Sequence, residues 1–342
     1  MYVKILWSIL LLYFIKSIGY SQDSIHCSPI HCDHRDLSPN SASNFHVHPK
    51  GSWMFNLNLE SIWSKGWNRP LNADGGYLMY PASLYRQMQM FMLMYGVSDR
   101  LNMMLMMHYC FHTMDMSSAG QENSHHHSIE NHKNKESYSG IGDAELSCNF
   151  SVLKKDHSEL ILTTGVRIPT GKINEKGKTD GMYEGLVLPY AMQQGAGTFG
   201  LSEGLSYILR GRNWQHGLQV LASHYLGKNS YGYRMGDRYT MNIWSACRWN
   251  KWVSNSVRIN GSMEETIKGK NVHLLQVLEP SANTVNYGGY GLSVFAGTNF
   301  YTSVKSVNFK IAMEFGVPVL QKLNGLQLNT RYNFQLSLIT LI

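Results

Sequence analysis

The sequence predicts an all-β protein, a transmembrane antiparallel β-barrel of about 12 strands that follows a cleaved signal peptide. Apolar and polar residues alternate with a period of two over segments of roughly ten residues, which is the period of a strand and the length of a tilted membrane strand. The connections between these segments fall into a short and a long class. Charged residues make up only 15% of the chain and aromatic residues 12%.

The alternation is clearest near the end of the chain, in residues 326–339, "LQLNTRYNFQLSLI". Leu328, Tyr332 and Phe334 fall on one face, whereas Asn329, Arg331 and other polar residues fall on the opposite face. A helix would distribute these residues over all sides. The same pattern predicts strands at 52–60, 84–95, 100–116, 143–152, 159–169, 199–209, 214–226, 238–249, 251–263, 288–302 and 308–318.

The predicted connections alternate in length along the chain. Short ones lie at 96–99, 154–157, 210–213, 250–251 and 302–306, and long ones at 64–83, 115–138, 171–197, 227–237, 265–287 and 319–325. Short turns on one side and long loops on the other are typical of outer-membrane barrels, as are aromatic girdles at strand ends. The aromatic residues expected in the girdles are Trp53, Trp63, Tyr85, Tyr95, Trp214, Trp249 and Trp252.

The N-terminus has the pattern of a secretory signal. Lys4 precedes an apolar run from Ile5 to Ile15, and small residues stand before a cut expected ahead of Gln22. We therefore expect a signal peptide at 1–21, a segment containing His and Cys at 22–50, and an outer-membrane β-barrel at 51–342. The expected location is the outer membrane of a Gram-negative bacterium.

The charge pattern and the motifs argue against several classes of function. The formal charge of +7 is spread thinly along the chain, so no basic cluster predicts nucleic-acid binding. "GAGTFG" at 195–200 lacks the lysine of a phosphate loop, and no hydrolase motif is present. We therefore expect no enzyme activity. The expected partners are outer-membrane lipid and a small-molecule or metal-ion solute.

Residues 100–116, "RLNMMLMMHYCFHTMDM", hold the strongest functional signal. The alternation assigns Leu101, Met103, Leu105, Met107, Tyr109 and Phe111 to the lipid face. The lumen face then carries a column of thioether, imidazole and thiol groups: Met104, Met106, His108, Cys110, His112, Met114 and Met116. Such groups are preferred ligands of Cu(I), Cu(II) and Zn. Because alternate residues of a strand lie ~7 Å apart, these groups share an ion only with rearrangement or with help from a neighbouring strand.

Two further observations bear on the metal hypothesis, in opposite directions. In the preceding segment Met88, Met90, Met92 and Met94 alternate with glutamines, which indicates that these methionines face lipid as ordinary apolar residues. In the loop that follows, His125, His126 and His127 form a histidine-rich tract, a composition typical of metal binding. Copper or another soft metal ion is therefore one candidate ligand or substrate, and methionines that simply fill an apolar interior are the alternative.

Seven segments, read in order, resemble the meta-pathway phenol-degradation group of outer-membrane transporters, in its methionine-rich branch associated with copper-handling genes. The segments are "HVHPKGSWMFNLNLE", "MYGVSDRLNMMLMMHY", "SGIGDAELSCNFSVL", "GVRIPTGKI", "LPYAMQQGAGTFGLSEGLSY", "GYRMGDRYTMNIWSACRW" and "EFGVPVLQKLNGLQL", and they run from about residue 46 to 340. The resemblance implies a transmembrane barrel that transports small molecules, and it implies no catalytic residues.

Four readings of function remain open. The first is passive transport of a soft metal ion along the lumen column, and the second is transport of a small aromatic or hydrophobic solute. The third is a plugged structural or metal-sequestering barrel, which paired charges inside the lumen, such as those of Glu314, Lys310 and Arg331, would favour. The fourth, a barrel enzyme, would require a Ser–His pair within ~3 Å at the barrel rim.

Overall fold

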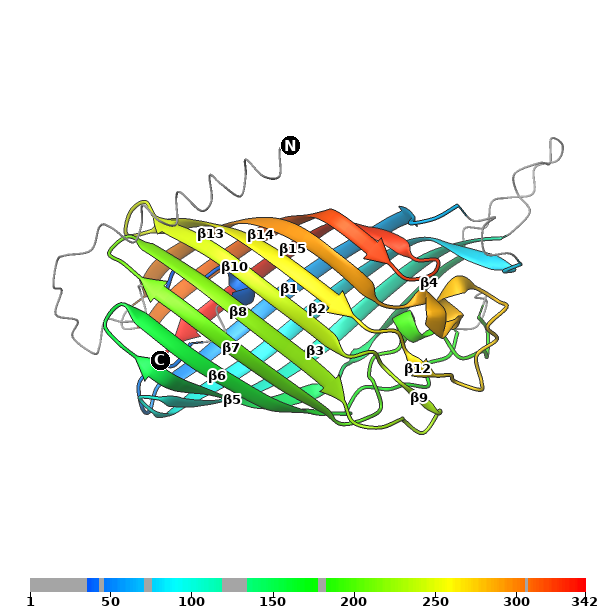
Figure 1. Cartoon of the computed structure of the whole chain (residues 1–342), viewed down its shortest axis with the longest axis horizontal. Helices are drawn as coiled ribbons and strands as arrows, with labels where there is room; N and C mark the ends of the chain where they lie inside the picture. Colours follow the sequence, from blue (N-terminus) through cyan, green and yellow to red (C-terminus); the bar gives the residue numbers. More distant parts are fainter. Residues whose placement is uncertain (1–35, 43–45, 71–75, 119–133, 178–182, 305–306) are drawn as a thin grey trace. The chain divides into compact units, whose positions relative to one another are not determined.

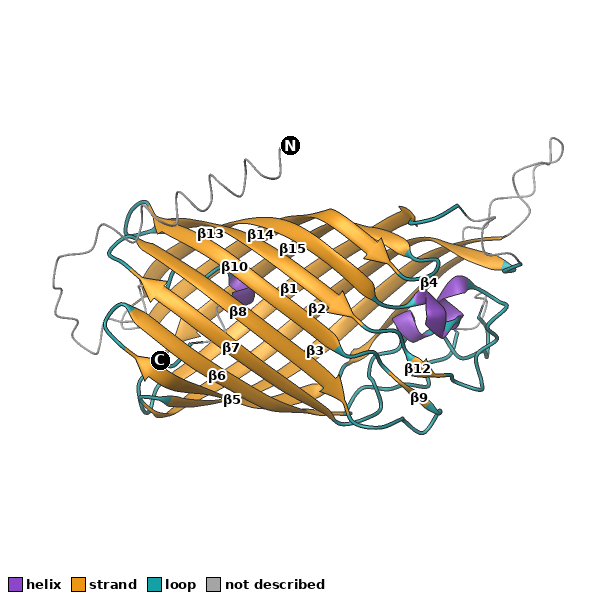
Figure 2. Ribbon diagram, in the orientation of Figure 1, coloured by secondary structure: helices purple, strands orange, loops and turns teal. Residues whose placement is uncertain are grey.

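The computed structural model describes residues 36–342 except 43–45, 71–75, 119–133, 178–182 and 305–306. Nearly all regular structure in these residues is β-strand (Figure 2). The helical elements are the short 3₁₀ turns η3 (Asn40–Ala42), η5 (Tyr190–Met192), η6 (Pro280–Ala282) and η7 (Thr284–Asn286). None of the helices in the described ranges is long and apolar enough to cross a membrane.

A closed barrel of 12 antiparallel strands confirms the predicted fold (Figure 1). Each strand pairs with its sequence neighbours, and the first strand closes the barrel by pairing with the last. The strands are β1 (Trp53–Trp67), β2 (Met79–Ser98), β3 (Leu101–Ser118), β4 (Asn134–Ile141), β5 (Ala144–Lys154), β6 (Ser158–Ile168), β7 (Gly200–Arg210), β8 (Trp214–Tyr225), β10 (Arg238–Arg248), β11 (Val253–Glu264), β13 (Gly289–Val304), β14 (Val307–Leu323) and β15 (Leu328–Leu341). β4 and β5 form one interrupted strand, because both pair with β3.

Short turns lie at one end of the barrel and long loops at the other, as predicted, except after β14, which continues to Leu323 and leaves only residues 324–327 before β15. A second difference lies in the first strands, which also continue into residues predicted as loop. β2 begins at Met79 and pairs with β3 as far as Ser118, because backbone pairing continues beyond the membrane-length apolar pattern. β9 (Tyr233–Arg234) and β12 (Lys268–Gly269) form a small separate sheet within the long loops.

The outer face of the barrel is apolar. Large hydrophobic side chains that alternate along the strands are exposed, among them Leu57, Phe150, Leu162 and Leu205. Of the aromatic residues expected at strand ends, Trp53, Tyr95, Trp249 and Trp252 are exposed, and Trp63, Tyr85 and Trp214 are half-buried. A band of this kind is stable only against lipid, and the closed ladder leaves no strand edge unpaired within it.

The inside of the barrel holds a segment of the chain's own N-terminal part. Residues 36–42 and 46–50, here called the plug, cross the lumen near the short-turn end, and η3 lies inside the ring of strands (Figure 2). The plug makes hydrogen bonds to several walls: to Gln215 on β8, Glu314 on β14, Asn58 on β1 and Asn102 on β3. A segment bonded to walls that face one another fills the space between them.

Candidate functional site

The β3 column points inward, as the alternation predicts. Met104, Cys110, Met114 and Met116 are buried, and the residues between them, such as Met103 (47% exposed), are on the outside. His108 and His112 are half-buried and occupy the same inner face. The structure thus places every described member of the predicted column on the lumen side of one strand.

The prediction for β2 was wrong. Met92 and Met94 are 1% and 0% exposed and pack inside the barrel, while Phe91 and Tyr95 are exposed on the outside. The two-residue alternation is present, but the two faces were assigned the wrong way round. The polar glutamines Gln87 and Gln89 were predicted to face the lumen, but they lie on the outward face. Strand pairing decides the matter, since Met94 is paired with inward-facing Met104. The methionines of β2 therefore belong to the lumen.

The register of β2 and β3 arranges soft donors in rows across the two strands. Directly paired residues have Cβ atoms ~4.5–5.5 Å apart, closer than neighbours along one strand. From the short-turn end toward the middle, the paired residues are Met94 with Met104, Met92 with Met106, Met90 with His108, and Met88 with Cys110. Met54 on β1 extends the first row, because it pairs with Met94. We call this inner surface of β1, β2 and β3 the soft wall.

Two features interrupt the soft wall. Arg86 pairs with His112 and adds a fixed positive charge above the Met88–Cys110 row. The strand break between β4 and β5 lies beside His108: a Cβ on Gly142 would meet the His108 ring at 2.0 Å, so a larger residue there would displace the ring. Asp143, next in the chain, accepts hydrogen bonds from the backbone N–H groups of Gly171 and Ala196 and ties the β6–β7 loop to the break.

The described His, Cys, Asp and Glu side chains give the metal hypothesis no support of their own. Within the described ranges, no group of three or more His, Cys, Asp or Glu side chains is arranged to hold a metal ion. His108, Cys110 and His112 are therefore not one ready ligand set. The predicted histidine tract His125, His126 and His127 lies outside the described residues.

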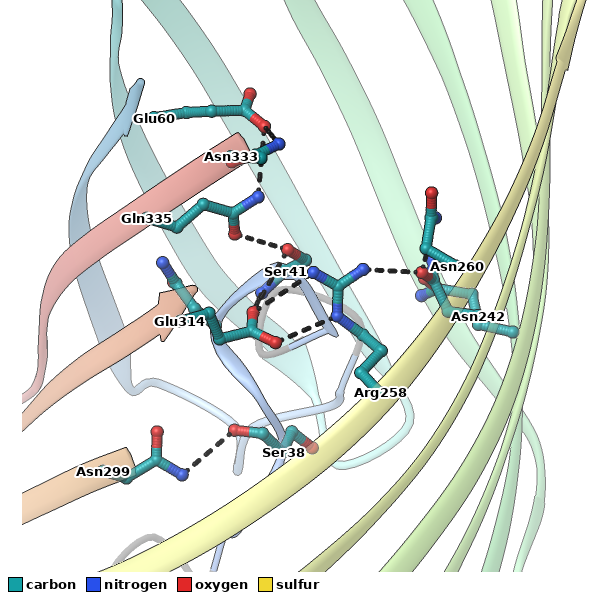
Figure 3. Close-up of polar contacts among 12 residues, drawn as sticks. Ser38, Ser41, Glu60, Asn242, Arg258, Asn260, Asn299, Glu314, Asn333 and Gln335 are labelled. Carbon is teal, nitrogen blue, oxygen red and sulfur yellow. Dashed lines mark hydrogen bonds and ion pairs between the residues drawn. The ribbon is translucent and has the colours of Figure 1, made fainter. Parts of the chain in front are cut away.

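Another part of the lumen is ionic and amide-rich (Figure 3). Arg258 on β11 and Glu314 on β14 form an ion pair of 3.0 Å, and both side chains are almost fully buried. Arg258 also donates to Asn242 on β10. On the other side, Ser41 of the plug donates its backbone N–H to Glu314 and its hydroxyl to Gln335. We call this surface of β10, β11, β14 and β15 the polar wall.

Paired charges therefore do plug the interior, although with partners other than those the sequence suggested. Glu314 pairs with Arg258 rather than with Lys310, and the Lys310 ammonium lies 3.0 Å from the Asp36 carboxylate of the plug. Arg331 is exposed and donates to the backbone oxygen of Lys65 on the neighbouring strand, not across the barrel. The partner of Lys310 was missed because Asp36 precedes the first strand.

Described parts of the long loops pack together at the other end of the barrel. Tyr190, Tyr233 and Tyr287 come from three different loops and stack edge to face. Beneath them a buried cluster contains Met79, Met114, Met116, Tyr138, Tyr183, Leu188 and Met192. A small pocket with room for about one water molecule lies beside it between the β6–β7 and β11–β13 loops, lined by Tyr183, Leu186, Val187, Pro189, His273, Leu274, Leu275, Leu278 and Ala282. Burial raises the pKa of the neighbouring Glu279 carboxyl to about 7.

Comparisons with known proteins bear on the fold. The protein is similar to an outer membrane channel from Pseudomonas putida F1, with a TM-score of 0.57, 13% identity, and coverage of 90% of this chain and 100% of that one. Lower similarity relates it to the Pseudomonas putida toluene transporter TodX (TM-score 0.39, 10% identity, 90% and 94% coverage). The protein has a similarly low similarity to the β domain of the Bordetella autotransporter BrkA, with a TM-score of 0.42, 10% identity, and coverage of 85% of this chain and 99% of that one.

No family model and no curated protein matches the sequence. The resemblance noted from the sequence is thus supported in its coarse part, as a barrel with the fold of an outer-membrane channel. Together with the apolar outer band, the closed ring of 12 strands identifies the chain as a β-barrel of the Gram-negative outer membrane type.

Proposed function

We propose that this barrel is a plugged passive channel whose solute is a soft metal ion, with Cu(I) as the foremost candidate. The observation that carries the proposal is the pairing of β2 with β3, which sets soft donors opposite one another in four consecutive rows. Thioether, imidazole and thiol groups select Cu(I) over harder ions. Rows of similar sites along a wall suit passage, because an ion exchanges between sites of comparable affinity.

Passage along this wall requires two changes in the closed structure. The plug must move at the short-turn end, since it bonds to walls on both sides of the lumen. The ion must also pass Arg86, whose positive charge opposes a cation. The proposal therefore describes a channel that is closed at rest.

Equilibrium binding of Cu(I) to the detergent-solubilised protein, measured anaerobically against a competing chelator, tests the proposal. The test variant carries Met90→Leu, Met92→Leu and Met106→Leu, substitutions that conserve volume. The matched control carries Met103→Leu, Met107→Leu and Met241→Leu, three methionines on the lipid side. We expect the lumen variant to lose at least ~10-fold in affinity, about 1.4 kcal/mol, and the control to bind as the unmodified protein does. Equal affinity in all three proteins would contradict the proposal.

A second candidate, a channel for a small hydrophobic or aromatic solute, is favoured by the aliphatic side chains that line the small pocket in the loops, which must widen to admit such a solute. Leu275 and Val277 at the margin of this pocket are exposed. Binding of toluene to the solubilised protein, and its loss on Leu278→Asn, would support this candidate. Saturable toluene binding without Cu(I) binding would replace the metal proposal with this one.

A further inference from the structure

We infer that the plug and the soft wall together form a distinct site for one monovalent soft ion, and that an ion bound there latches the plug shut. His46 and His48 supply imidazoles from the plug, and Met54, Met94 and Met104 supply thioethers from the wall. The inference rests on the proposed function for the class of ion, but it adds a site shared between the plug and the Met94–Met104 row, and a regulatory role for that site.

The central pair is already close to bonding distance for a shared ion. His48 Nε2 lies 3.2 Å from Met54 Sδ, and both residues are almost completely buried. Metal bonds to nitrogen of about 2.0–2.1 Å and to sulfur of about 2.3 Å place two donors about 3.5 Å apart at a tetrahedral angle. Separating the two atoms by a few tenths of an ångström is enough to admit an ion.

The remaining thioethers lie in the same row. Met54, Met94 and Met104 are consecutive partners across β1, β2 and β3, and they pack in one buried cluster. Met94 Sδ accepts a hydrogen bond of 3.0 Å from Asn102 Nδ2. Three thioethers beside an imidazole form a donor set of the kind that selects Cu(I).

His46 supplies an independent sign of a missing ligand. Its ring centroid lies 4.3 Å from that of His48, and its Nδ1 is buried without a hydrogen-bond partner among the described residues. Buried polar atoms in folded proteins nearly always have a partner. An ion bound at His46 Nδ1 in the cell would supply the partner that this atom lacks. Asn102 holds the histidines against β3 by accepting from the His48 N–H and donating to the His46 carbonyl.

The charge of the site favours a monovalent ion. All five donors are neutral when the imidazoles are unprotonated, and none is a carboxylate, so a divalent ion would retain its full charge in a buried place. Asp36 is the nearby anion that interacts electrostatically with both histidines, and it already binds the Lys310 ammonium. Cu(I) and its mimic Ag(I) therefore fit, whereas Zn²⁺ and Ca²⁺ do not.

Because the imidazoles belong to the plug and the thioethers to the wall, a shared ion joins two parts that must separate when the channel opens. An ion that binds only the closed form lowers the open population about 100-fold when its free concentration is 100 times the dissociation constant. The ion would then regulate its own passage: an occupied latch keeps the plug in place.

Hydrogen–deuterium exchange of the solubilised protein with and without Ag(I) tests the latch. We expect Ag(I) to slow exchange at least ~10-fold in peptides that cover residues 46–54, and His48→Gln or Met54→Leu to abolish the effect. Met103→Leu, whose side chain faces lipid beside Met104, is the control and should keep the effect. The variant Met90→Leu, Met92→Leu, Met106→Leu should also keep it, because it leaves the latch donors intact.

The outcomes separate the latch from the proposed channel. Ag(I) bound by the rows without slower exchange at residues 46–54, or with equal slowing in His48→Gln, overturns the latch and leaves the channel proposal standing. Slower exchange that persists in the variant Met90→Leu, Met92→Leu, Met106→Leu, together with unchanged Cu(I) affinity in that variant, supports the latch alone. Absence of Ag(I) and Cu(I) binding in every protein rejects both.

Discussion

The soft wall and the polar wall face the same lumen but differ in what their side chains can do. Met92 and Met94 of the soft wall pack without ion pairs, whereas Arg258 and Glu314 of the polar wall are joined to each other and, through Ser41, to the plug. Replacing a buried methionine with leucine lowers the free energy of unfolding only slightly, because the two side chains have similar volumes. Removing one partner of a buried ion pair lowers it strongly, because the other charge is left buried without compensation. The polar wall is therefore expected to set stability and closure, and the soft wall to set ligand choice.

The largest effect is expected from breaking the ion pair of the polar wall. Glu314→Gln leaves the Arg258 guanidinium buried without its counter-charge, which costs about 3–5 kcal/mol of folding free energy. Urea unfolding of the protein in detergent measures this loss. Met94→Leu in the soft wall should cost less than about 1.5 kcal/mol in the same assay. Equal losses of folding free energy in the two variants would contradict the proposal that the polar wall, rather than the soft wall, sets stability.

A pH titration distinguishes the stability of the loops from that of the two walls. Burial raises the pKa of Glu279 from 4.5 to about 7, so the folded loops hold its proton more tightly than the unfolded chain does. Stability from this group is complete below pH ~4.5 and falls as the pH rises through 7, by at most about 3 kcal/mol. Protease cleavage of the loops should therefore increase between pH 5 and 8, and Glu279→Gln should remove this dependence. A cleavage rate that rises equally in the variant would contradict the assignment.

Cation binding along the soft wall should respond to the positive charge of Arg86. Arg86→Gln removes a positive charge from the position above Met88 and Cys110. At an effective dielectric constant of about 20, a unit charge some 8 Å away opposes a monovalent cation by about 2 kcal/mol, and solvent and salt reduce this figure. We expect a several-fold gain in Cu(I) affinity, measured by chelator competition. Unchanged affinity would mean that the ion does not lie in these upper rows.

The smallest effect is expected at the strand break beside His108. Gly142→Ala pushes a methyl group into the His108 ring and so displaces one imidazole from its row. We expect a two- to threefold loss of Cu(I) affinity with little change in the rows nearer the plug. Gly140→Ala, two residues earlier, within β4 and against a Gln194 side chain that can move, serves as the control.

The fold was predictable because one rule, the two-residue alternation, repeats along almost the whole chain. The same rule placed Met104 and Cys110 on the lumen side of β3 without any knowledge of its neighbours. It failed on β2, where glutamines lie on the outward face and methionines on the inward one, so polarity alone suggested the wrong side. Only the pairing of Met94 with Met104, a contact between strands, corrects the assignment.

The plug could not be predicted for a related reason. The contacts of Asp36 with Lys310 and of Ser41 with Glu314 join residues more than 270 positions apart in the chain. Residues 36–50 carry no strand alternation that would indicate where they lie. Histidines 46 and 48 were noticeable in composition, but their position against Met54 follows only from the threading of this segment through the lumen.

X-ray absorption at the copper edge of the Cu(I)-loaded protein tests the central claim most directly, because it reports which atoms surround the ion. The soft wall predicts sulfur neighbours at about 2.3 Å, accompanied by nitrogen, and a loss of the sulfur signal when the inward methionines are replaced by leucine. A shell of nitrogen and oxygen alone, unchanged by those substitutions, would place the ion elsewhere and contradict the account.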